Sequence, residues 1–117
     1  MVLLGRLGEA IARSRVVDRG FKVGGVGLAT SGFAHFVAPG PFVAISRFVF
    51  PEDTDNWVKV NGASEAAIGL ALLDSRTRTA GVIGLLVYCA YLGDRAATAI
   101  TGQLRAGGQV SEPTFAD

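Results

Sequence analysis

Three apolar stretches, separated by short links, constrain the fold of this sequence more than any other feature. They cover residues 23–38, 57–73 and 79–93, and "DRAATAI" extends the third as a helix. Many of the 16 glycines lie inside them, which is costly for a helix in water but common in membrane helices. The stretches therefore predict an all-α membrane bundle. None contains twenty clean apolar residues, so buried helices of a soluble bundle remain an alternative.

The overall composition favours the bilayer. Half of the 117 residues are apolar and 18% are charged, whereas soluble domains have about a quarter of their residues charged. The formal net charge of +1 argues against a nucleic-acid partner held through its phosphates. At this length we expect a single domain.

The charges alternate between the links in a way that predicts a topology. An acidic link follows the first stretch, and basic residues both precede that stretch and follow the second. Three membrane-spanning helices would then place the N-terminus and residues 74–78 in the cytoplasm and residues 39–56 outside. The acidic residues are Glu52, Asp53 and Asp55, and the basic ones are Arg6, Arg13, Arg15, Arg19, Lys22, Arg76 and Arg78.

The chain divides into three predicted segments. Residues 1–20 form an N-terminal amphipathic helix that lies on a membrane surface or packs on its own domain. Residues 21–101 form the transmembrane bundle, in which "PGPFVAISRFVFP", residues 39–51, adds a short interfacial or re-entrant helix. Residues 102–117 are predicted to be a weakly ordered tail. The apolar side of the first helix contains Leu3, Leu4, Leu7 and Ile11.

Small residues at a spacing of four mark the predicted helix-packing faces. Gly25 and Ala29 form such a pair in the first stretch, and Gly62 and Ala66 form one in the second, with Gly69 beyond. This spacing lets helix backbones approach closely.

Glu65 is the most informative polar residue, because a carboxylate in an apolar helix must be protonated or hydrogen-bonded. The candidate partners are Asn61 one turn earlier, His35 and Ser31 in the first stretch, and a tyrosine hydroxyl such as that of Tyr88. Two interpretations stay open. The cluster of His35, Asn61, Glu65 and Tyr88 relays protons or binds a quinone carbonyl, or it holds the helices in register.

Motifs of catalysis and metal binding are absent from the sequence. There is no HExxH, GxSxG or phosphate-binding glycine loop, so no residue is predicted to be catalytic. Cys89 is the single cysteine, and it has no partner at ligand spacing. We therefore predict no metal site.

Several of these elements, in this order, resemble the DoxX-like family of small bacterial membrane proteins. The similar strings are "GLATSGFAHFVAPGPFVAI", "VNGASEAAIGLALL" and "RTRTAGVIGLL", within residues 22–95. They include Gly32, His35-Phe36, Pro41-Phe42, Gly62, Glu65, Gly69 and Arg76-Thr77-Arg78. The resemblance implies a four-helix membrane bundle of the bacterial cytoplasmic membrane, here without an apolar last span.

The resemblance also implies an association with membrane redox systems and quinones. The first functional hypothesis is an accessory or assembly subunit of a larger respiratory or redox complex, not itself an enzyme. Its partners would be the bilayer and other membrane subunits, or further copies of the chain. The alternative is a quinone-binding redox component that uses His35, Asn61, Glu65 and Tyr88.

Overall fold

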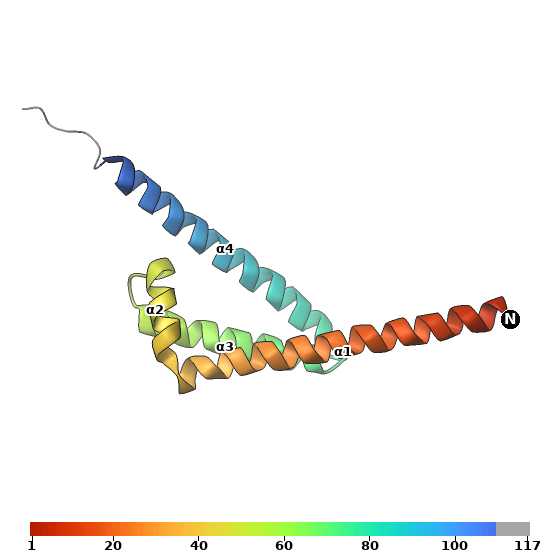
Figure 1. Ribbon diagram of the computed structural model, residues 1–117. Coiled ribbons are helices and arrows are strands. Elements are labelled where there is room, and N and C mark those ends of the chain that lie inside the picture. Colours follow the sequence, from red (N-terminus) through yellow and green to blue (C-terminus); the bar gives the residue numbers. More distant parts are fainter. Residues whose placement is uncertain (110–117) are drawn as a thin grey trace, which may run out of the picture.

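The part of the chain that the structure describes is all-α, with four helices in the order α1 to α4 (Figure 1). The computed structural model describes residues 1–109, and residues 110–117 lie outside this part. The helices are α1 (Val2–Val37), α2 (Pro39–Val49), α3 (Thr54–Leu73) and α4 (Arg78–Gln109). No strand occurs within residues 1–109.

Helix α1 is one continuous helix of 36 residues. The sequence predicted two elements here, an amphipathic helix in residues 1–20 and a span after it, but no break separates them. The physical reason is that α1 contains no proline, and isolated glycines weaken a helix without ending it. Its N-terminal part projects past the other helices (Figure 1), and the side chains of Leu3, Leu4, Leu7 and Ile11 are exposed there.

The chain bends by 96° between α1 and α2. Ala38 leaves the helical conformation, with φ −134° and ψ 69°, because the residue before a proline avoids the helical region. Pro39 then begins α2, where the missing N–H costs nothing. The short helix predicted between Pro41 and Pro51 is therefore present. After α2, Asp53 adopts the left-handed conformation with φ 55° and precedes α3.

Helices α1 and α3 pack together with their backbones in close contact. A Cβ atom added at Gly32 would lie 2.6 Å from the carbonyl oxygen of Gly62 and 2.8 Å from the Cα of Ala66. Two turns away, a Cβ atom at Gly69 would lie 2.7 Å from the carbonyl oxygen of Gly25 and 2.8 Å from the Cα of Ala29. The five residues predicted as packing residues thus meet at this interface, where Gly32 joins them.

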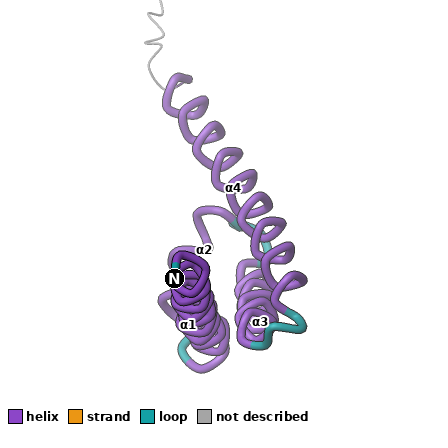
Figure 2. The backbone as a smooth tube through the Cα atoms, turned by 90° about the vertical axis from the view of Figure 1, so that its right-hand side faces the viewer, coloured by secondary structure: helices purple, strands orange, loops and turns teal. Residues whose placement is uncertain are grey.

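Helix α4 contacts the other helices from Arg78 to Arg95, and its C-terminal part extends away from them (Figures 1 and 2). It continues to Gln109, so residues 102–109 of the predicted weakly ordered tail are helical, and the rest of that prediction falls on residues 110–117, outside the described part. The glycines at 102, 107 and 108 do not end the helix, because no proline accompanies them before residue 113.

Within residues 1–109, only α4 has both the length and the apolar character of a membrane span by itself, over Arg78–Gly108. Just 6% of its most apolar window is buried. Helices α1 and α2 meet the same criterion as one bent pair. Among the described helices, α3 does not, because polar residues such as Asn56, Lys59 and Asn61 lower the mean hydropathy of its first half. The structure thus contains one or two helices suited to a membrane.

The α1–α3 contact generates a prediction about its glycines. Gly32→Ala should lower the free energy of unfolding by about 1–3 kcal/mol, because the added methyl group overlaps the backbone of α3. Gly27→Ala is the matched control, because nothing lies within 4 Å of that position and alanine favours the helix. Both variants can be measured by reversible denaturation in detergent. Equal stability of the two variants would refute the close contact.

Candidate functional site

The carboxylate of Glu65 joins three helices. The hydroxyl of Ser31, on α1, donates a hydrogen bond of 2.8 Å to its Oε2 atom. The hydroxyl of Tyr88, on α4, donates a hydrogen bond of 2.8 Å to its Oε1 atom. Each carboxylate oxygen therefore has one hydroxyl donor, and the three side chains come from α1, α3 and α4. Hydrogen bonds of this kind compensate a carboxylate for the loss of water.

His35 lies one turn after Ser31 and is 6% exposed. Its Nδ1 atom lies 2.8 Å from the carbonyl oxygen of Ser31. A carbonyl oxygen only accepts, so Nδ1 carries a proton and donates. The ring stacks on Phe42 of α2, with centroids 3.8 Å apart. Ser31 thus connects His35 with Glu65, through its carbonyl on one side and its hydroxyl on the other.

Asn61 is 5% exposed, one turn before Glu65 on α3. Its Oδ1 atom has no hydrogen-bond partner within the described chain. Of the four partners considered for Glu65 from the sequence, the structure pairs it with Ser31 and a tyrosine, and not with Asn61 or His35. The buried amide of Asn61 is left with unused hydrogen-bonding capacity, which is costly in an interior.

These side chains surround a cavity of about 320 Å³. Its volume lies in the range of small-molecule sites, which are mostly apolar and contain a few convergent polar groups. All four residues predicted as a possible quinone or proton site line this one cavity. The polar lining consists of Ser31, His35, Ser46, Asn61, Glu65 and Tyr88, and the apolar lining of Phe42, Ile45, Val49, Phe50, Leu92 and Ala96.

An aromatic cluster, which was not predicted from the sequence, adjoins the cavity at Phe50. Phe50 stacks on Trp57 at 5.0 Å, and Tyr91 lies 6.1 Å from Phe50 and 6.0 Å from Trp57. The guanidinium of Arg95 lies over all three rings, 5.4 Å from Phe50 at the closest. Such cation–π contacts fix α4 to α3 at this level. The sequence feature that could have predicted this cluster is the position of Arg95 one helical turn after Tyr91.

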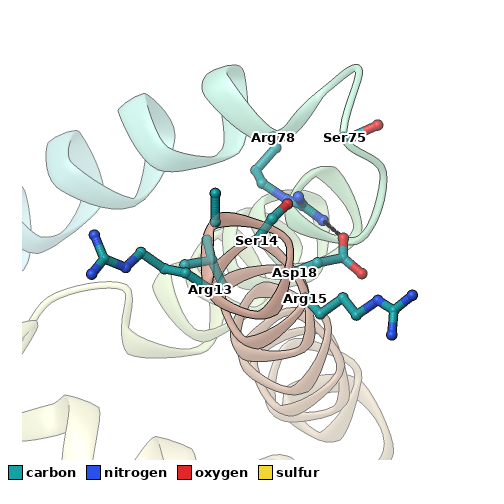
Figure 3. Close-up of a pocket in the computed structure, with 8 residues that line it drawn as sticks. Arg13, Ser14, Arg15, Asp18, Ser75 and Arg78 are labelled. Atoms are coloured by element: carbon teal, nitrogen blue, oxygen red, sulfur yellow. Dashed lines mark hydrogen bonds and ion pairs between the residues drawn. The ribbon is translucent and has the colours of Figure 1, made fainter. Parts of the chain in front are cut away.

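A second polar contact holds the start of α4. Arg78 donates to Asp18 of α1 at 3.0 Å and to the carbonyl oxygen of Leu72 at 3.1 Å (Figure 3). Its guanidinium also lies 4.7 Å from the ring centre of Phe21. Lys22 forms a further ion pair of 2.9 Å with Asp18. Hydrogen bonds from Lys22 and Arg78 lower the pKa of Asp18 below its ordinary value.

Metal ligands do not gather at the cavity. Within the described residues, no group of three or more histidine, cysteine, aspartate or glutamate side chains is placed to hold a metal ion. The arrangement is therefore one of hydroxyls, an amide, an imidazole and a carboxylate beside apolar walls. It can exchange hydrogen bonds and protons with a small molecule.

The family described as "Domain of unknown function (DUF8561)" matches residues 25–112. The match covers most of the chain, including the cavity, and the chain belongs to this family. No curated protein and no solved structure matches the chain.

The Glu65 contacts generate a prediction about two substitutions. Glu65→Ala leaves the hydroxyls of Ser31 and Tyr88 without their acceptor, and should lower the free energy of unfolding by roughly 2 kcal/mol. Glu65→Gln retains the shape and can bond to both hydroxyls, so most of the stability should remain. Ser64→Ala is the control, because that hydroxyl bonds only to the Val60 carbonyl. Equal losses in the Ala and Gln variants would contradict this assignment.

Proposed function

We propose that the protein is a multi-pass protein of the bacterial cytoplasmic membrane whose cavity binds the headgroup of a quinone-type molecule. The observation that carries this proposal is the cavity itself, where polar groups from all four helices converge beside apolar walls. The resemblance to the DoxX-like family, with its link to membrane redox systems, adds support. The polar groups would hold the headgroup, and the apolar walls would accept the ring.

The proposed topology has three crossings. The C-terminal part of α1, helix α3 and helix α4 cross the bilayer, with α2 near the outer surface and the N-terminus in the cytoplasm. The alternating charges of the links support this orientation. The exposed apolar side chains of α4, such as Ile83, Leu86 and Val87, suit contact with lipid. Crossing by α3 requires that Glu65 be compensated inside the bilayer, as its two hydroxyl donors allow.

The lining of the cavity fits such a headgroup. A quinone has carbonyls that accept hydrogen bonds, and its reduced form has hydroxyls that donate them. The amide of Asn61 can donate to the first and accept from the second through its unpartnered Oδ1. His35, with its proton fixed on Nδ1, has Nε2 left for proton exchange. When bound, the quinone would supply two-electron redox chemistry.

A second candidate function is an accessory subunit of a larger membrane redox assembly. The observation favouring it is the exposure of α4, of whose most apolar window only 6% is buried. A helix of another subunit, or a second copy of the chain, could cover that surface. In this case Glu65 serves mainly to hold α1, α3 and α4 in register. Purification in mild detergent with identification of co-purifying proteins separates this candidate from a free-standing quinone-binding protein.

Binding to the cavity can be measured through Trp57, the only tryptophan of the chain. Trp57 stacks on Phe50, which lines the cavity, so a short-chain benzoquinone should quench its fluorescence saturably. Asn61→Leu should weaken this binding about tenfold, the effect of a lost buried hydrogen bond. The control Ser64→Ala should leave it unchanged. Absence of saturable quenching, or equal binding by the Asn61 variant, would overturn the proposal.

A further inference from the structure

A second hollow lies at the opposite end of the bundle from the aromatic cluster. It is a groove of about 730 Å³ between α1 and the turn that joins α3 to α4 (Figure 3). Residues of α1 from Ala10 to Asp18 form one wall, and Ser75 and Arg78 form the other. None of these residues takes part in the cavity around Glu65, so this groove is a separate feature of the molecule.

The acidic residue in the groove is already neutralised. Asp18 accepts ion pairs from both Lys22 and Arg78, at 2.9 and 3.0 Å. Arg78 is 16% exposed and is held in place by the Leu72 carbonyl and the ring of Phe21. Two cations thus share one carboxylate. The remaining charge of the groove is positive.

Arg13 and Arg15 supply that remaining charge. Neither forms an ion pair or hydrogen bond within residues 1–109, and the same holds for the hydroxyls of Ser14 and Ser75. Figure 3 shows the two arginine side chains leaving α1 on opposite sides, with Ser14 and Asp18 between them. In this view the two arginines point away from each other and the Ser75 hydroxyl points outward. Arginines that flank a groove containing the Ser14 hydroxyl can turn toward a phosphate group between them, which arginine and hydroxyl donors bind well.

We propose that this groove binds the phosphate headgroup of an anionic phospholipid. Under the proposed topology, on which this inference rests, the groove lies at the cytoplasmic end, where basic pockets between helices bind anionic headgroups. Arg13 and Arg15 would turn toward the phosphate from two sides, and the hydroxyl of Ser14 between them would donate to it. The half-exposed Val17 would meet the start of an acyl chain.

The test uses the full-length chain, delipidated in detergent, with lipids added back and counted by native mass spectrometry. Phosphatidylglycerol should bind well above phosphatidylcholine, and its binding should fall with added salt. The double substitution Arg13→Gln with Arg15→Gln should weaken phosphatidylglycerol binding roughly 30-fold, from the usual effect of two basic residues near a membrane surface. Arg105→Gln, at the far end of α4, is the control and should change nothing. Circular dichroism verifies that each variant is folded.

Three outcomes would overturn the inference: equal binding of the two lipids, equal loss in the control variant, or no loss in the double variant. Added inorganic phosphate shows whether the groove binds a lipid headgroup or the free anion. If it is a site for the free anion, millimolar phosphate should displace the bound lipid. The result also separates this inference from the proposed function. A chain that binds benzoquinone without preferring phosphatidylglycerol would contradict the groove alone, and a chain that does not enter membranes would contradict both.

Discussion

The carboxylate of Glu65 is the interaction on which the arrangement of the helices depends. Removing a carboxylate from water costs several kcal/mol unless hydrogen bonds replace the lost hydration. Ser31 and Tyr88 replace it with one hydroxyl each, from α1 and α4. The close approach of α1 and α3 at Gly32 and Gly62 makes this possible, because a side chain at either glycine would separate the two backbones. Packing and polar contacts therefore support each other.

Helix α4 is held by polar and cation–π contacts at three levels, and Gly81 and Gly84 pack on Leu72 and Ile68 of α3 between the first two. Arg78 contacts Asp18 at the start, Tyr88 contacts Glu65 in the middle, and Arg95 lies over the aromatic cluster of α3. Beyond these contacts the helix extends away from the others (Figure 2) and is largely exposed. With α4 attached in this way, the cavity is bordered by polar groups that can also form hydrogen bonds to a ligand. The attachment also leaves apolar surface for lipid or another subunit, as both candidate functions require.

The sequence predicted much of this structure, and the exceptions have physical reasons. Prolines 39, 41 and 51 delimit α2, and small residues at a spacing of four identify the α1–α3 interface. The continuity of α1 was missed because the change from charged to apolar residues near Lys22 suggested a boundary where the backbone has none. The sequence limits the hydrogen-bond partners of Glu65 to a few residues but does not determine which of them bond to it. That depends on how α1 and α4 are rotated about their axes, because the rotation decides which hydroxyl faces the carboxylate. The Arg95 cluster joins residues from three parts of the chain, Phe50, Trp57 and Tyr91, whose meeting no local pattern predicts.

The central claim is that Glu65 lies within the bilayer, between an outer loop and a cytoplasmic turn. Single-cysteine labelling of intact cells tests it most directly, with Cys89→Ala as the background because that thiol is exposed. Asp55→Cys should react with a membrane-impermeant maleimide, and Ser75→Cys should react only after the cells are permeabilised. The reversed pattern, or release of the protein by carbonate washing, would contradict the claim.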